Sequence, residues 1–568
     1  MAEVREVDVN GVRWLVREDL ADFLQGCGAL DAWKLAGHPS ARVVDKARGR
    51  VIFTVSLPRD GDDPLRLTVT RFERPRLRDL VRALLGGSRA PGLWRTAGVL
   101  ESIGIRTPRR VAVGVRRSAG VLRDDCYICE TASGVTALDD FVAGALAKAS
   151  PAERGRMLRR AVPLLAGFVR QLHDHGVRHR DLDAHAVAVE EQEGGAWGLM
   201  LVDLEGVRCG GALPVGARLR ELAQLGRFFS TAVSRTTRHR FWKTYVRGIP
   251  FLEHHREAYA RLLAEQVARV REASYRAWER RCLGTNRDFR RFDVRGVRGC
   301  MVRGRIELSD EVLSRIPERG LVMPDAVVWK DSDTTQVWEQ RLDFGTEVRT
   351  IVIKRKKPRE GMRFARTFLR RVGALREWQK AHAMKVRGLP VADVLAAFEK
   401  RSMGLLYDTY LITEKVEGAE SLQRFVERVF SGGVSVQRAR LRRRMARALG
   451  TVIRRVHDAG FCHRDLKPDN ILVRVGDAGP DDFDFTLIDF EGVWRRKVRE
   501  QDRARDIGRI AAMFVEGDAV RTTDMMHFLD GYLKGHPVSR ERRRRFFLDV
   551  QRCAWEKRAA WKARGYLS

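Results

Sequence analysis

Hydrophobic and polar positions in the second half of the chain follow strand and helix periods in turn. Thr350-Ile-Val-Ile-Lys354 alternates with a period of two and predicts a strand. Residues 363–387 carry Phe, Leu, Val and Trp at helical spacing and stop before Gly388-Leu-Pro, which predicts a helix and its end. Further on we expect a strand at 410–414, an amphipathic helix at 436–457, and paired strands at 470–473 and 485–488. This order predicts a strand-rich small lobe followed by a helical large lobe.

The same pattern occurs earlier in the chain. His179-Arg-Asp-Leu recurs 284 positions later as His463-Arg-Asp-Leu, and Val202-Asp-Leu-Glu-Gly206 recurs as Ile488-Asp-Phe-Glu-Gly492. The same offset relates Trp94 to Trp378, Gly104 to Gly388, Glu130 to Glu414, Gly134 to Gly418 and Leu138 to Leu422. Because this period is far too long for a solenoid, it indicates two tandem copies of a whole domain. We expect the copies at 1–285 and 290–568, with the junction near 282–300.

The second copy carries a recognisable chemical motif. His463-Arg-Asp-Leu-Lys-Pro-Asp-Asn470 and Ile488-Asp-Phe-Glu-Gly492 resemble the catalytic loop and the metal-binding segment of the protein-kinase superfamily. The predicted fold is therefore α+β, with two tandem bilobal protein-kinase-like domains. Phosphoryl transfer needs a positioned hydroxyl and stabilised phosphate charge. We predict that Asp465 accepts the hydroxyl proton, that Lys467 neutralises the γ-phosphate of ATP, and that Asn470 and Asp489 hold Mg²⁺.

The nucleotide also needs a lysine on a strand and a helical carboxylate to fix that lysine. Lys354 ends the predicted strand, and Glu377 follows it by 23 residues on the predicted helix. Lys356 and Lys357 are the alternative candidates for this nucleotide-binding lysine. No GxGxxG loop precedes Lys354, so residues 330–345 are expected to cover the nucleotide by another route.

In the features that depart from the protein-kinase pattern, the second copy resembles the lipopolysaccharide kinase (Kdo/WaaP) family. The likeness rests on Arg376-Glu-Trp378 before Gly388-Leu-Pro, on Tyr410-Leu-Ile-Thr-Glu414, on the glycine-less nucleotide loop and on Glu491. It covers about 320–515, and more weakly about 40–230. The resemblance implies that Glu414 lies at the nucleotide hinge and that the acceptor is a sugar hydroxyl of lipopolysaccharide or a related glycolipid.

Two alternative functions stay open at this point. No Ala-Pro-Glu anchor occurs between Asp489 and Asp506, which leaves little surface for a peptide substrate. The loop from His463 to Asn470 nevertheless reads like that of a Ser/Thr protein kinase, which is the first alternative. A non-catalytic kinase-like scaffold is the second.

The first copy lacks most of the predicted chemical groups. Lys354, Glu377 and Asn470 correspond to Thr70, Leu93 and Ala186, whereas Asp181 and Asp203 are retained. His185 beside the lost asparagine is a weak candidate metal ligand. Since the groups that orient ATP are missing, the first copy is predicted to be a pseudokinase.

Composition adds an expectation about partners and location. The net charge is +33, which attracts polyanions such as anionic lipid headgroups or phosphorylated glycolipids. No zinc-finger or RNP signature accompanies the charge, so nucleic acid is not favoured as a partner. The eight cysteines are scattered, and Cys126 and Cys129 are read as ordinary strand residues. Without a signal-like or membrane-spanning run, we expect a cytoplasmic protein that associates peripherally with the inner membrane.

Overall fold

The computed structural model describes residues 3–566 except 48, 60–61, 74–88, 119–120, 193–195, 307–308, 310–325, 344–347, 358–372, 403–404, 431–434, 477–481 and 517–519. The chain divides into two compact units, Met1–Glu272 and Ala273–Ser568. This division falls inside helix α10 (Arg256–Arg281), upstream of the junction expected at 282–300. The cause is packing within the second unit, because Trp378 donates its indole N–H to the Cys282 carbonyl at 2.8 Å and Arg387 pairs with Glu279 at 2.7 Å.

Each unit begins with a seven-stranded antiparallel sheet of the same topology. The strand order is β1-β2-β6-β7-β5-β4-β3 in the first unit and β13-β14-β18-β19-β17-β16-β15 in the second. The first-unit strands are Val4–Val9, Val12–Arg17, Arg42–Ala47, Arg50–Arg59, Asp62–Glu73, Arg110–Ser118 and Val121–Glu130. The second-unit strands are Phe289–Val294, Val297–Val302, Val327–Ser332, Thr335–Asp343, Val348–Lys356, Val394–Ser402 and Leu405–Glu414. The matching order confirms the tandem duplication.

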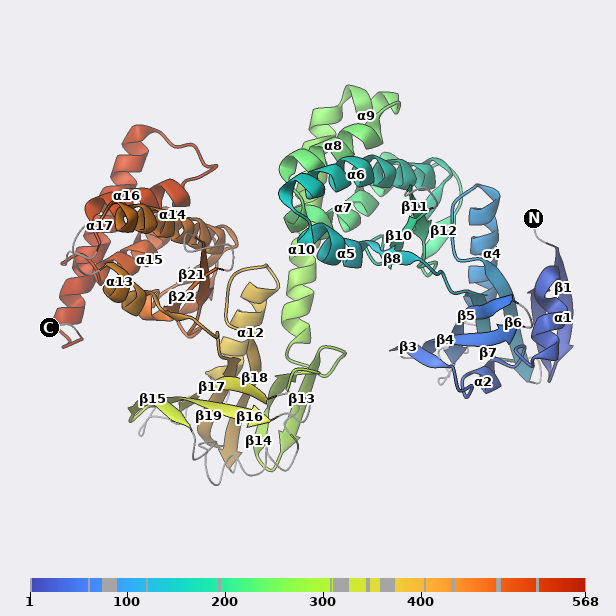
Figure 1. Ribbon diagram of the computed structural model, residues 1–568, viewed down its shortest axis with the longest axis horizontal. Helices are drawn as coiled ribbons and strands as arrows, with labels where there is room; N and C mark the ends of the chain where they lie inside the picture. Colours follow the sequence, from blue (N-terminus) through green and yellow to red (C-terminus); the bar gives the residue numbers. More distant parts are fainter. Residues whose placement is uncertain are drawn as a thin grey trace. The chain divides into compact units, whose positions relative to one another are not determined.

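A helix packs at the corresponding place on each sheet. Helix α4 (Arg89–Ser102) contacts β6 and β7, and α12 (Ala374–Lys385) contacts β18 and β19 (Figure 1). The helix predicted at 363–387 is therefore present in its second part, and its first part lies outside the described residues. Two further helices, α1 (Glu18–Gly26) and α2 (Ala32–Leu35), follow β2 in the first unit, and most of the corresponding stretch of the second unit lies outside the described residues.

A mainly helical lobe follows each sheet, again in the same order. In the first unit it contains β8 Val135–Ala137, α5 Leu138–Phe141, a π-helical turn Val142–Leu146, α6 Pro151–Asp174, β9 Val177–His179, β10 Val187–Glu191, β11 Trp197–Leu201, β12 Val207–Cys209, α7 Val215–Ala232, α8 Arg235–Val246 and α9 Pro250–His254, then α10. In the second it contains β20 Glu420–Ser421, α13 Leu422–Phe430, α14 Val436–Asp458, β21 Phe461–His463, a 3₁₀ turn Pro468–Asn470, β22 Ile471–Val475, β23 Phe483–Leu487, β24 Val493–Arg495, α15 Glu500–Ala512, α16 Thr522–Tyr532 and α17 Arg540–Lys562.

The helical lobes share a buried polar contact. His173 and Tyr245 lie 2.7 Å apart (Nδ1 to Oη) in the first unit, and His457 and Tyr532 lie 2.8 Å apart in the second. Burial lowers the pKa of His457, so this imidazole is held neutral. The two units therefore repeat a specific side-chain arrangement as well as a topology, and each has the bilobal protein-kinase-like fold predicted from the sequence.

No helix within the described ranges is long and apolar enough to cross a lipid bilayer. The eight cysteines form no disulfide, and Cys126 and Cys129 are buried in β7, where burial raises the pKa of the Cys129 thiol to about 12.

Candidate active site

The second unit contains a pocket of about 1060 Å³. Its walls come from β15, β16, β17 and the end of β19, from the loop between β21 and β22, from the residues after β23, and from α17. It contains the predicted residues Lys354, Glu414, Asp465, Lys467, Asn470 and Asp489. Glu377 lies directly behind Lys354 on α12.

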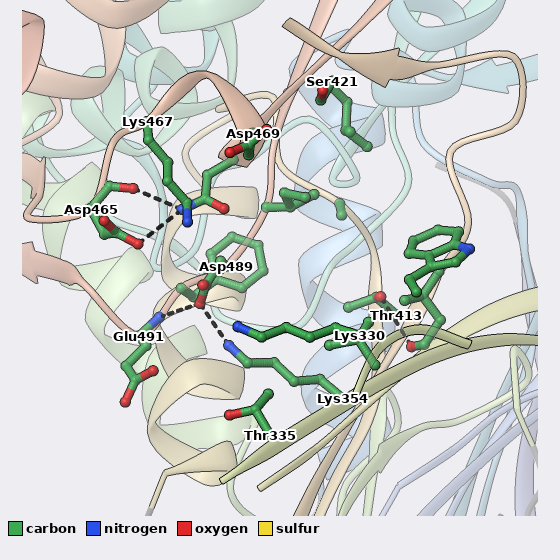
Figure 2. Close-up of a pocket in the computed structure, with 18 of the residues that line it drawn as sticks. Lys330, Thr335, Lys354, Thr413, Ser421, Asp465, Lys467, Asp469, Asp489 and Glu491 are labelled. Carbon is green, nitrogen blue, oxygen red and sulfur yellow. Dashed lines mark hydrogen bonds and ion pairs between the residues drawn. The ribbon is translucent and has the colours of Figure 1, made fainter. Parts of the chain in front are cut away.

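Strand alternation aims Lys354 into this pocket. Ile351 and Ile353 are fully buried on one face of β17, so Lys354 and Lys356 lie on the opposite face. Lys354 Nζ donates to Asp489 Oδ1 at 2.7 Å and to Glu377 Oε2 at 3.2 Å (Figure 2 shows the first of these). Burial by itself would lower the pKa of Lys354, but these two carboxylates raise it above the ordinary lysine value.

Glu377 binds two lysines. Its carboxylate is almost fully buried and accepts from Lys356 Nζ at 3.0 Å as well as from Lys354. Lys356 also pairs with Glu491 at 2.5 Å. The competitor named from the sequence thus takes part in the same network, but among the described contacts Lys354 is the lysine that reaches Asp489.

The loop that carries Asp465 is held by buried polar groups. The backbone N–H of His463 donates to Asp506 on α15 at 2.6 Å. Burial lowers the pKa of His463, and the neutral ring accepts the Asp465 backbone N–H through Nδ1 at 3.2 Å. Asn470 Nδ2 then donates to the Asp465 carbonyl at 2.8 Å and to its Oδ2 at 3.3 Å. These contacts fix the Asp465 carboxylate at the pocket wall.

The segment after β23 is pressed against this loop. A Cβ on Gly492 would lie 3.0 Å from the Asp465 backbone nitrogen, so only glycine fits comfortably. Asp489 has a φ of +59°, a strained value for a non-glycine residue that is typical of functional sites. Burial would raise the pKa of Asp489, but Lys354 lowers it to about 2, which keeps the carboxylate ionised.

The donor set at Asn470 and Asp489 fits a magnesium ion. The backbone N–H of Ile488 donates to the Asn470 carbonyl at 3.0 Å, which brings the two residues together. One ionised carboxylate and one amide oxygen suit Mg²⁺, which is bound through few protein oxygens together with substrate phosphates. The described residues contain no cluster of three or more His, Cys, Asp or Glu side chains able to form a complete protein cage.

The remaining predicted residues also line the pocket. Lys467 makes no ion pair with any described carboxylate. Glu414 ends β19, and its carboxylate pairs with Arg349 at 3.5 Å and Arg305 at 3.7 Å. The hairpin of β15 and β16 contributes Lys330, Thr335 and Val337 in place of a glycine-rich loop. The end of the expected 330–345 segment lies outside the described residues.

Comparison with known proteins assigns the family. The sequence model of the lipopolysaccharide kinase (Kdo/WaaP) family matches residues 38–245 and again residues 359–532. The chain belongs to this family. Each match falls in one structural unit, in agreement with the tandem duplication.

Individual relatives of this lipopolysaccharide kinase family member are distant. A 3-deoxy-D-manno-octulosonic acid kinase from Haemophilus influenzae (strain PittEE) is 29% identical over 140 residues, 23% of this chain and 53% of the relative. A 3-deoxy-D-manno-octulosonic acid kinase from Actinobacillus succinogenes is 30% identical over 176 residues, which cover 30% of this chain and 67% of the relative. The chain spans about half the length of the Haemophilus influenzae relatives that it matches. A solved structure titled WaaP in complex with acyl carrier protein is 20% identical, with 45% of this chain and 98% of that chain covered and a TM-score of 0.35.

The first kinase-family unit presents different residues at the same positions. Thr70 pairs with Tyr127 in the register in which Lys354 pairs with Leu411, and Ala186 is buried. Burial raises the pKa of Asp203, although Arg50 and His179 partly oppose the rise, whereas Lys354 lowers the pKa of Asp489. The other retained carboxylate, Asp181, pairs with its neighbour Arg180 at 3.1 Å.

His185, the candidate metal ligand of the first unit, pairs with a carboxylate of α5. Its Nδ1 lies 2.7 Å from Asp139 Oδ2, and its side chain is largely exposed.

Sequence reasoning missed several residues at this pocket. Lys380 donates to the backbone carbonyls of Phe490 at 3.3 Å and Glu491 at 2.7 Å and so braces the segment after Asp489. Its position on the α12 face that carries Glu377 was the available signal. Lys557, Trp561 and Arg564 reach the pocket from α17 and the residues after it, and no local pattern pointed to them.

Proposed function

We propose that the second unit transfers the γ-phosphoryl group of ATP to a sugar hydroxyl of lipopolysaccharide or a related cell-envelope glycolipid. The observation that carries the proposal is the linked set of Lys354, Glu377 and Asp489 in one pocket with Asp465 and Asn470. Membership of the lipopolysaccharide kinase family supports the sugar acceptor. The names of the 3-deoxy-D-manno-octulosonic acid kinases similar to this chain point to an acidic sugar.

The chemistry follows from the charges in the pocket. Lys354, oriented by Glu377, binds the α- and β-phosphates, and Lys467 balances charge on the γ-phosphate. Asp465 accepts the proton of the acceptor hydroxyl as its oxygen bonds to the γ-phosphorus. The bond from that phosphorus to the bridging oxygen breaks, and ADP leaves with the electron pair. Asn470 and Asp489 would hold Mg²⁺, which when bound neutralises phosphate charge.

We propose that the first unit is a pseudokinase. Thr70, Leu93 and Ala186 supply neither a phosphate-binding cation nor the amide ligand. We also propose that the protein acts at the cytoplasmic face of the inner membrane, to which the +33 charge would attract it.

A Ser/Thr protein kinase is the second candidate, because residues 463–470 fit the HRDxxxxN pattern of protein kinases at every position. The short path from Asp489 through β24 to Asp506 on α15 argues against a peptide platform. A kinase-like scaffold without turnover is the third candidate.

Labelled ATP distinguishes the three. The purified full-length protein would be incubated with γ-labelled ATP and, in parallel, with cell-envelope glycolipid and with protein fractions; Asp465→Asn would serve as the inactive control. Label on glycolipid that depends on Asp465 supports the proposal. Label on protein serine or threonine supports the second candidate, and absence of both transfer and ATP hydrolysis supports the scaffold.

A further inference from the structure

Helix α17 supplies one wall of the catalytic pocket. Lys557 and Trp561 in its last turns, and Arg564 just beyond its end, line the same pocket as Asp465 and Lys467. We call Lys557, Trp561 and Arg564 the α17 cluster. None of the three belongs to the motifs that bind nucleotide or metal, so their presence beside Asp465 requires a separate explanation.

The helix is held firmly against the helix that fixes the catalytic loop. A Cβ on Gly508 of α15 would lie 2.7 Å from the Cys553 Cβ, which shows how closely α15 and α17 pack. Buried Arg558 donates to the Ala512 carbonyl at 3.3 Å and to Glu516 at 2.9 Å. Because α15 also carries Asp506, the α17 cluster and the Asp465 loop are attached to one rigid element.

Charge is balanced on one side of α17 but not on the pocket side. Glu516 pairs with Arg558 and, at 2.8 Å, with Lys562. Lys557 and Arg564 make no ion pair with a carboxylate in the part of the chain that the structure describes. Burial lowers the pKa of Lys557, and the nearby cations Arg509, Arg564 and Lys467 lower it further, while Asp465 opposes them. Cations gathered in this way form a site for an anion.

Trp561 adds an aromatic group to the pocket wall. Its side chain is largely buried, and Lys557 Nζ lies 5.2 Å from the centre of its ring. A sugar ring with an attached acidic group needs both features: an aromatic wall for its C–H face and a cation for its anion.

We propose that the α17 cluster is the acceptor subsite of the proposed sugar kinase. Lys557 and Arg564 bind a carboxylate or phosphate of an acidic sugar, and Trp561 packs against the ring, so that a neighbouring hydroxyl faces Asp465. This inference rests on the proposed function, and it adds the residues that select the acceptor and the requirement that the acceptor be an anion.

Paired probes test the charge requirement directly. The methyl glycoside of 3-deoxy-D-manno-octulosonic acid carries a carboxylate, its methyl ester is neutral, and a hexose 6-phosphate carries phosphate instead. Steady-state kinetics would compare the wild-type chain with Lys557→Ala, Arg564→Ala and Lys557→Arg. Arg552→Ala is the matched control, because Arg552 is an exposed α17 residue paired with Asp549 that does not line the pocket.

We expect KM for the acid glycoside to rise about tenfold in each alanine variant, since one charge-assisted contact is lost. The KM for ATP should stay within about twofold, and Lys557→Arg should restore most of the affinity. For the wild type, the KM of the neutral ester should be as high as the KM of the acid is for the alanine variants. The KM of the ester should be the same in the wild type and in Lys557→Ala. Preference of wild type for the hexose phosphate over the acid glycoside would identify phosphate as the anion.

Binding measured without ATP separates this inference from the proposed function. If wild type phosphorylates the acid glycoside and both alanine variants match it in KM, the α17 assignment is overturned while the function stands. A fall in kcat alone, or a rise in KM for ATP, also overturns it, because the cluster would then act through Asp465 or the nucleotide. Calorimetric binding that needs Lys557, without any transfer by wild type, keeps the subsite and removes the proposed reaction. Absence of binding to wild type overturns both.

Discussion

At the scale of single residues, the two units place corresponding aspartates in different electrostatic surroundings. Asp489 and Asp203 occupy corresponding positions, yet their pKa values shift in opposite directions. The difference is Lys354, which supplies a cation 2.7 Å from Asp489, where the first unit has Thr70. The lysine on this strand therefore accounts for the lowered pKa of the Asp489 carboxylate.

The first prediction concerns this pair. Lys354→Met and Asp489→Asn should each lower phosphoryl transfer by about 10²-fold or more, since each removes charge stabilisation at the phosphates. Lys356→Met should cost less, because Lys354 still holds Glu377. Rates measured under saturating ATP, together with circular dichroism to verify folding, check this. Turnover of Asp489→Asn at the wild-type rate would contradict the magnesium assignment.

The second prediction concerns pH. The pKa of Asp489 is depressed to about 2 in the folded protein, so its ionised form stabilises the fold above the unfolded pKa of about 3.9. That contribution is lost as pH falls through the folded pKa. The thermal midpoint of Asp489→Asn should therefore lie below wild type at pH 7 and approach it below about pH 4. Scanning calorimetry of the second unit's transition measures the gap, and a gap independent of pH would refute the linkage.

At the scale of elements, close helix packing shapes the helical lobe of the second unit. A Cβ on Gly450 of α14 would lie 2.1 Å from the Phe528 carbonyl oxygen of α16, and one on Gly531 would lie 2.0 Å from the Arg447 carbonyl oxygen. The two helices can thus approach almost to backbone contact. This approach positions His457 against Tyr532.

The third prediction tests that contact. Gly450→Ala should destabilise the protein by about 1–3 kcal/mol, because the backbone of α16 cannot yield without repacking. Gly167→Ala is the control: Gly167 lies within α6 with nothing near its Cβ position, so alanine should be neutral or stabilise by up to about 1 kcal/mol. Denaturant melts compare the two, and equal effects would contradict the packing argument.

At the scale of the whole molecule, the chain combines two units of one fold with unequal chemistry. The sheets share their strand order and the helical lobes share their buried His–Tyr contacts. The two units therefore share their topology and this buried contact, but differ at Lys354, Glu377 and Asn470 of the pocket, where the first unit has Thr70, Leu93 and Ala186.

The fourth prediction follows from this asymmetry. Asp465→Asn in the full-length chain should abolish most transfer, while Asp181→Asn should leave it within a few-fold of wild type. The reason is that Thr70, Leu93 and Ala186 stand in the first unit where the second has Lys354, Glu377 and Asn470. Parallel assays of the two variants on one acceptor measure the ratio, and comparable losses would overturn the pseudokinase assignment.

The fifth prediction concerns the net charge of +33. Reversible binding to anionic vesicles is expected, at about 1 kcal/mol for each basic residue near the surface, and it should weaken as salt rises. Sedimentation with phosphatidylglycerol vesicles across a salt series measures this, with phosphatidylcholine vesicles as the control. No binding at low salt would remove the membrane proposal.

Identity and spacing along the chain were enough to predict the duplication, the kinase-like fold, the loop around Asp465 and the groups missing from the first copy. Strand alternation also pointed to Lys354, and helical spacing to Glu377. These features are encoded locally, because a motif or a period is complete within a few residues.

Only the tertiary structure decided which distant groups meet. Lys354 and Asp489 are 135 residues apart, and their contact depends on how the sheet closes over the helical lobe. The shared use of Glu377 by Lys356, the point within α10 at which the units divide, and the approach of α17 to Asp465 likewise depend on packing between elements far apart in the sequence. A local pattern determines which face of a helix or strand is apolar. Which distant residues contact the polar face depends on the tertiary fold.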